Sequence, residues 1–167
     1  MNARNFARSA LMACWSAPRF GVVSYGIGCR IANSATIRRG MLQLGNDVFI
    51  GPECFIQLPM RIGNHVMLSA RVGVVGGNHR FDVVGVPMSQ TGRESFLPVV
   101  IEDDVWVGYG AILLGGCVLG RGCIVAAGAV VTRNVPPGAL VAGVPARELR
   151  RRFASRPDED RHWAGLR

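Results

Sequence analysis

The chain has 167 residues, 49% of them hydrophobic and 18% charged, which suffices for one domain with a buried core and excludes an intrinsically disordered chain. The formal net charge is +8, and every basic residue is arginine. This charge either favours an anionic partner or reflects the compositional bias of the source genome. Only 7% of residues are aromatic and no basic stripe contains them, so nucleic acid is excluded as a partner. The five cysteines include no CxxC pair, so we expect no zinc site, no disulfide framework and a cytoplasmic location.

Residues 1–30 are expected to form a cap segment at one end of the fold. Their apolar side chains share one face of a helix: Phe6, Ala10, Leu11, Cys14 and Trp15. The apolar stretch at 10–14 is too short for a secretory signal or a membrane span. We favour a capping helix, and peripheral membrane contact through its apolar face is the alternative.

A six-residue repeat runs through residues 31–136. Every sixth residue is Ile, Leu or Val in two registers: Leu44, Ile50, Ile56, Ile62, Leu68 and Val74, then Ile101, Val107, Leu113, Leu119, Val125 and Val131. Gly often follows, to permit a tight corner, and the fifth position is small or aliphatic, which explains Cys54, Cys117 and Cys123 as packing residues. One such unit cannot bury its apolar face alone, so the units are expected to stack into an all-β solenoid.

This pattern resembles that of the hexapeptide-repeat acyltransferases, most specifically over residues 101–150, and the resemblance covers nearly the whole chain. It implies a left-handed parallel β-helix with three hexads per triangular coil. The most similar branch contains sugar O-acetyltransferases, including enzymes of polysaccharide biosynthesis. The resemblance therefore implies acetyl-coenzyme A as the acyl donor, a sugar or glycan acceptor, and a homotrimer with active sites between neighbouring subunits.

The repeat is interrupted by a loop at residues 76–99, and a long excursion from a regular solenoid usually has a function. Two glycines and Asn78 lead to His79, whose neutral imidazole could take the proton from a sugar hydroxyl as it attacks a thioester. Similar enzymes place a general base here, so we expect His79 to be catalytic; a structural loop histidine is the alternative. Asn78, Asp82 and Glu94 are candidate acceptor-binding residues. Asp82, Glu94 or a backbone carbonyl could hold the second imidazole nitrogen.

Coenzyme contacts are expected in the second half of the repeat. The small side chains around Ala127 leave backbone amides accessible to the pantetheine arm. By resemblance, Thr132 and Arg133 contact the coenzyme, as does the pair Arg147 and Arg150. A guanidinium fork at these positions suits the phosphates of the nucleotide end.

Two aromatic residues complete the expected coenzyme site. Trp106 either flanks the pantetheine or packs between subunits, and a backbone N–H near Tyr109 is a candidate donor to the reaction's oxyanion. We expect His65 to be exposed and His162 to have no role. Because these histidines do not cluster with His79 in sequence, no metal site is expected.

Residues 137–167 are expected to form a C-terminal segment beyond the solenoid, which ends at consecutive prolines. We expect a helix from Pro145, with Leu149 and Phe153 packed against the coil, and a loosely ordered tail from Arg156. Two other functions remain open. The acceptor could be an antibiotic, an amino sugar or serine, or the β-helix could be a non-catalytic scaffold.

Overall fold

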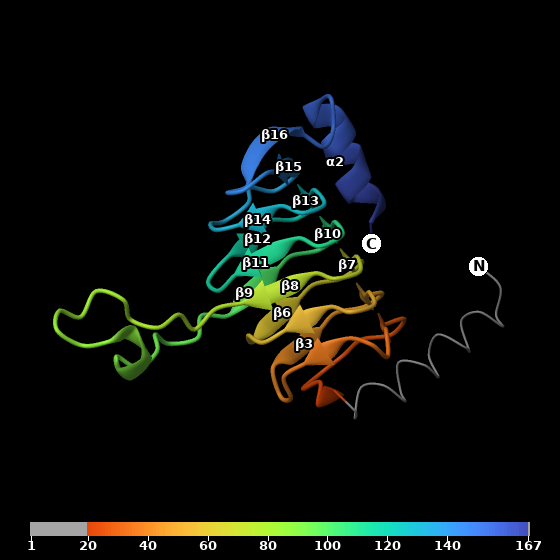
Figure 1. Cartoon of the computed structure of the whole chain (residues 1–167). Helices are drawn as coiled ribbons and strands as arrows, with labels where there is room; N and C mark the ends of the chain where they lie inside the picture. Colours follow the sequence, from red (N-terminus) through yellow and green to blue (C-terminus); the bar gives the residue numbers. More distant parts are fainter. Residues whose placement is uncertain (1–19, 167) are drawn as a thin grey trace.

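The computed structural model describes residues 20–166 and shows a left-handed parallel β-helix with three sheets as its faces (Figure 1). Sheet I has seven strands: β1 (Arg30–Ile31), β4 (Phe49–Ile50), β7 (Met67–Leu68), β10 (Trp106–Val107), β13 (Ile124–Val125), β15 (Ala139–Ala142) and β16 (Arg147–Arg151). Sheet II has five: β2 (Thr36–Ile37), β5 (Phe55–Ile56), β8 (Gly73–Val75), β11 (Ile112–Leu114) and β14 (Val130–Val131). Sheet III has four: β3 (Leu42–Leu44), β6 (Met60–Ile62), β9 (Val99–Ile101) and β12 (Val118–Leu119).

The chain visits sheets I, II and III in turn, so the molecule has three corners, named here I/II, II/III and III/I. Regular coils have 18 residues, as the pairing of Leu42 with Met60 and of Trp106 with Ile124 shows. Met60, however, pairs with Val99, which is 39 positions later. The extra residues form the loop between β8 and β9, which projects from corner II/III and contains the short 3-10 helix η1 (Met88–Gln90) (Figure 1).

The structure confirms the six-residue repeat, because all twelve aliphatic residues of the two registers are buried between the three sheets. The glycines that follow them permit close stacking of coils rather than an unusual φ angle. A Cβ atom on Gly45 would lie 2.7 Å from the carbonyl carbon of Gly63 in the next coil, and one on Gly108 would lie 2.6 Å from the amide nitrogen of Ala127. Cys54, Cys117 and Cys123 are buried, as expected for packing residues.

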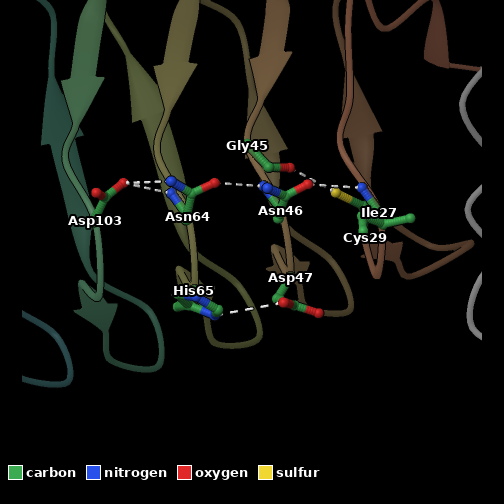
Figure 2. Close-up of polar contacts among 8 residues, drawn as sticks. All are labelled: Ile27, Cys29, Gly45, Asn46, Asp47, Asn64, His65 and Asp103. Carbon is green, nitrogen blue, oxygen red and sulfur yellow. Dashed lines mark hydrogen bonds and ion pairs between the residues drawn. The ribbon is translucent and has the colours of Figure 1, made fainter. Parts of the chain in front are cut away.

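At corner III/I, a ladder of polar side chains joins successive coils by hydrogen bonds (Figure 2). The backbone N–H of Ile27 donates to Asn46 Oδ1 at 3.0 Å, that of Asn46 to Asn64 Oδ1 at 2.9 Å, and that of Asn64 to Asp103 Oδ1 at 2.7 Å. Each amide or carboxylate oxygen thus satisfies a donor that the corner leaves unpaired. His65 is exposed beside this ladder, as expected, with its Nδ1 3.5 Å from a carboxylate oxygen of Asp47.

Two expectations for the C-terminal segment are wrong. Arg147–Arg151 is not helical but forms β16, antiparallel to β15, and Leu149 is exposed. The free edge of sheet I offers backbone hydrogen bonds that outweigh the helical preference of this stretch. The helix, α2 (Arg156–Gly165), lies where a loosely ordered tail was expected, and it begins after Ser155, whose hydroxyl accepts a hydrogen bond from the backbone N–H of Asp158.

His162 has a structural role, contrary to expectation. Its Nε2 lies 2.8 Å from Asp104 Oδ2 at corner III/I, and the same oxygen accepts a hydrogen bond from Arg152 Nη1 at 2.6 Å. Phe153 and Trp163 pack around the imidazole, with ring centroids 5.0 and 4.7 Å from it. This cluster holds α2 against the side of the solenoid (Figure 1).

The expected N-terminal helix over residues 6–15 lies outside the described residues, and so does any membrane contact through its apolar face. Within residues 20–166, no helix has the length and apolar character needed to cross a bilayer.

Candidate functional site

The base of the loop is a short antiparallel stem that carries His79. The backbone N–H of Arg80 donates to the carbonyl of Gly92 at 3.3 Å, and that of Glu94 donates to the carbonyl of Asn78 at 2.9 Å. Between these two bonds, His79 lies directly opposite Arg93. Such a pair, flanked by hydrogen bonds but not joined by them, has its Cα atoms about 4.5 Å apart and its side chains on one face of the stem.

The imidazole of His79 is exposed and accessible to a substrate. Within residues 20–166, no side-chain hydrogen bond holds either of its nitrogens, and neither Asp82 nor Glu94 forms an ion pair with it. The carboxylates of Asp82 and Glu94 are also exposed. Within one copy of the chain, neither of these two acids therefore orients the imidazole of His79.

A cavity of about 240 Å³ lies beneath the loop, between its stem and the lower strands of sheet II. Arg38 and Gln57, at the ends of β2 and β5, form one wall, and Arg93 and Phe96 of the loop form the other. The guanidinium carbon of Arg38 is 5.2 Å from the centre of the Phe96 ring. Gly77 packs against the same ring, since a Cβ there would lie 2.4 Å from Phe96 Cε1.

None of Arg38, Gln57 and Phe96 was among the predicted site residues. Arg38 and Gln57 each follow the inward aliphatic residue of a sheet II strand, so they occupy equivalent places in successive coils. β5 and β2 are the two sheet II strands that precede β8, where the loop begins. The repeat alone would therefore have placed Arg38 and Gln57 in the two coils beneath the loop. Phe96 could not have been assigned, because nothing in the loop sequence indicates which way its second half folds.

A second cavity, of about 290 Å³, lies at corner II/III above the loop and brings together three predicted coenzyme residues. Thr132, Arg133 and Arg147 all line it. Arg147 donates from Nη1 to the carbonyl of Ala146 at 2.9 Å. Arg150 does not line this cavity, and its Nη1 donates to the carbonyl of Arg151 at 2.9 Å.

The other predicted coenzyme residues lie at corner I/II, on the opposite border of sheet II. Trp106 donates from Nε1 to Ser69 Oγ at 3.1 Å, and the Tyr109 hydroxyl accepts from Arg71 Nη1 at 2.8 Å. Ala127 is exposed in the next coil. Among the described residues, the backbone N–H groups of Tyr109 and Ala127 donate to no acceptor, and the amide nitrogen of Ala127 packs against Gly108 of the preceding coil.

Sheet II therefore separates the predicted coenzyme residues other than Arg150 into two groups. One group, at corner II/III, shares that corner with the loop of His79, and the other faces away from it. Within residues 20–166, no group of three or more His, Cys, Asp or Glu side chains is arranged to hold a metal ion.

Comparisons with known proteins agree with the fold and the repeat. Residues 98–133 match the family described as bacterial transferase hexapeptide (six repeats). A putative acetyltransferase of Schizosaccharomyces pombe, C18B11.09c, is 41% identical over 112 residues, which are 66% of this chain and 53% of that protein. The chain spans about half the length of the first curated relatives that it matches.

Solved structures of hexapeptide-repeat enzymes share the architecture. The acetyltransferase VCA0836 from Vibrio cholerae is 27% identical, with a TM-score of 0.70 over 87% of this chain and 81% of that chain. A mutant of AntD, an N-acyltransferase from Bacillus cereus in complex with dTDP-4-amino-4,6-dideoxyglucose and coenzyme A, has a TM-score of 0.70 at 16% identity, over 92% and 97% of the two chains. The chain therefore matches the hexapeptide-repeat transferases over residues 98–133 and shares their fold, with a buried six-residue repeat and triangular coils.

Proposed function

We propose that the protein is an acyltransferase that transfers an acetyl group from acetyl-coenzyme A to a hydroxyl of a sugar or glycan precursor. The observation that carries this proposal is the stem at corner II/III, which interrupts a regular solenoid and presents His79 at the same corner as the cavity of Thr132, Arg133 and Arg147. A scaffold would need neither feature. The acetyltransferase relatives support the same class of reaction.

In the proposed mechanism, His79 acts as the general base. The neutral imidazole takes the proton of the acceptor hydroxyl while that oxygen attacks the thioester carbonyl. The tetrahedral intermediate then collapses, its carbon–sulfur bond breaks, and the sulfur leaves with the proton that the imidazolium returns. The products are the acetyl ester and free coenzyme A, with neutral His79 restored. A free backbone N–H, such as that of Tyr109, would suit the oxyanion or the pantetheine.

The division of the coenzyme residues between two corners favours a site built from two copies of the chain. Corner I/II of one copy would face the loop of the next, so that one coenzyme molecule contacts both groups. Exposed apolar side chains on sheets I and II suit such a contact: Phe55, Met67, Trp106, Tyr109 and Ile112 are all at least 37% exposed. We propose a homotrimer, as the family resemblance implies. Sedimentation analysis of the wild type and of Trp106→Asp tests it, since the charged variant should dissociate.

The proposed reaction is tested by thiol release from acetyl-coenzyme A over a panel of sugars, nucleotide sugars and simple glycans. His79→Asn should lower kcat by about 10²–10⁴-fold, the usual contribution of a general base, and leave coenzyme A binding unchanged. His65→Asn is the matched control, because His65 is also exposed and asparagine tolerates its φ of 57°. Equal rates for His79→Asn and the wild type would make His79 structural. Failure of the wild type to bind coenzyme A would favour the scaffold.

Transfer to the amine of an amino sugar is a second candidate, because AntD, an N-acyltransferase bound to an amino-sugar nucleotide, has the same fold. The product distinguishes the two reactions. An acetyl ester is cleaved by alkaline hydroxylamine and an amide is not, so mass spectrometry of the purified product after this treatment assigns the acceptor atom.

A further inference from the structure

We propose that the acceptor is anionic and that its phosphate or carboxylate group binds between Arg38 and Arg93 in the cavity beneath the loop. This inference rests on the proposed function, because it names the acceptor class of the same site. The two sources of the anion, a phosphorylated sugar and an acidic sugar, share the chemistry that these guanidinium groups recognise.

The two arginines reach the cavity from separate parts of the chain. Arg38 follows β2 at the end of a sheet II strand, and Arg93 belongs to the second strand of the loop stem. Phe96 lies under the Arg38 guanidinium at 5.2 Å, a cation–π contact that restrains this long side chain over the cavity. Gln57 and Thr36 add polar groups to the same lining, so the cavity can bind hydroxyls as well as an anion.

Within residues 20–166, no carboxylate neutralises either arginine. Several other arginines of residues 20–166 have a carboxylate partner within 4.0 Å: Arg71, Arg151, Arg152, Arg156 and Arg161. Arg38 and Arg93 have no such partner among the described residues, although both line one cavity. Two unpaired guanidinium groups facing one small volume repel each other, and a bound anion removes that repulsion.

The position of Arg93 joins this cavity to the proposed base. Arg93 is directly opposite His79 in the stem, and the pair is not joined by its own hydrogen bonds, so both side chains project from the same face. An acceptor whose anion lies between the arginines would therefore present a neighbouring hydroxyl on the side of the stem from which the imidazole projects. The cavity of Thr132, Arg133 and Arg147 remains free for the phosphates of the coenzyme.

Binding measured without turnover tests the inference independently of the reaction. Isothermal titration of the wild type with glucose 1-phosphate, glucuronate and methyl glucoside should show tighter binding of one or both anions than of the neutral sugar. Arg38→Gln and Arg93→Gln should each weaken anion binding about tenfold, because each removes a charge-assisted hydrogen bond. Arg39→Gln removes the same charge one residue away from the cavity, and it should leave binding unchanged.

Kinetics then separate this inference from the proposed function. With an anionic acceptor, Arg38→Gln and Arg93→Gln should raise the acceptor KM about tenfold and leave the KM for acetyl-coenzyme A unchanged. Transfer to neutral sugars alone, with both variants like the wild type, would overturn the anionic acceptor and leave the acyltransferase intact. No transfer to any acceptor, with anion binding still lost in the two variants, would overturn the proposed function and keep the anion site. Equal binding of methyl glucoside and the anions, or an equal loss in Arg39→Gln, would overturn the anion site itself.

Discussion

Gly77 stands near the start of the loop with a φ angle of +74°, and the ring of Phe96 packs against it. Replacement by alanine would place a Cβ atom 2.4 Å from Phe96 Cε1, whereas carbon atoms in favourable contact are about 3.5–4.0 Å apart. The ring is 39% exposed, so it can move, and it must move by about 1 Å or more to restore a normal contact. This displacement would disturb the stacking of Arg38 and the stem that carries His79.

A second glycine of the same loop separates the effect of the collision with Phe96 from the cost of a positive φ angle in alanine. Gly85 has a φ of +79° and nothing within 4 Å of its Cβ position, so Gly85→Ala carries the same backbone cost, about 1–2 kcal/mol, without the collision. A misplacement of about 1 Å near reacting groups can lower a rate about 10²-fold. We therefore expect kcat/KM of Gly77→Ala to be about 10–100-fold below that of Gly85→Ala. The two melting temperatures should agree within about 2 °C, because neither residue contributes to coil pairing.

Thiol release with the best acceptor and circular dichroism melts supply both measurements. In a Phe96→Ala background the ring is gone, so adding Gly77→Ala should cause little further loss. Equal activities of Gly77→Ala and Gly85→Ala would refute the reasoning. Full additivity with Phe96→Ala would refute it as well, because the effect of Gly77 would then not pass through the ring.

Three further predictions concern stability. Leu58 is 0% exposed, so Leu58→Ala should lower the free energy of unfolding, measured by urea titration, by about 2–5 kcal/mol. Leu149 is 65% exposed, so Leu149→Ala should change the same quantity by less than about 0.5 kcal/mol. Burial raises the pKa of the Cys123 thiol from 9.0 to about 12; the unfolded thiol therefore loses its proton first as pH rises. Stability should fall by about 1.4 kcal/mol per pH unit between these values, and Cys123→Ala should show a shallower decline between pH 9 and 11. Asp104→Asn removes the negative charge that Arg152 and His162 share and leaves one amide oxygen as acceptor, which weakens the attachment of α2. Proteolytic cleavage before this helix should therefore accelerate, and Trp163 fluorescence should shift towards that of exposed indole; unchanged protection would contradict this role.

The solenoid was predictable because its period is a local property of the sequence. Each coil buries an aliphatic residue at the same place on every face, so this residue type recurs at every sixth position and is visible without knowledge of the partners. The position of the loop was predictable for the same reason, as the point where the recurrence fails. His79 was proposed as the general base because of this interruption and of the family resemblance, and its role stays a prediction.

Features that depend on contacts between distant segments were not predictable. The residues around β16 carry no strand pattern, and this strand forms because β15 leaves a free edge beside it. Asp104 and His162 are 58 positions apart, and nothing in the sequence pairs them. Arg38 and Phe96 meet under the loop only because the stem folds back over β2, so their cation–π contact and the cavity that they line required the structure.

The antiparallel direction of β16 also determines how the molecule ends. A stack of parallel coils presents at its last coil the same unpaired backbone groups that it used at every earlier one, so a bare end could add another molecule and grow into a fibre. β16 reverses this direction and exposes all five of its side chains, three of them arginine. Like charges would then face each other whenever two of these ends meet, which disfavours association of two molecules through this end.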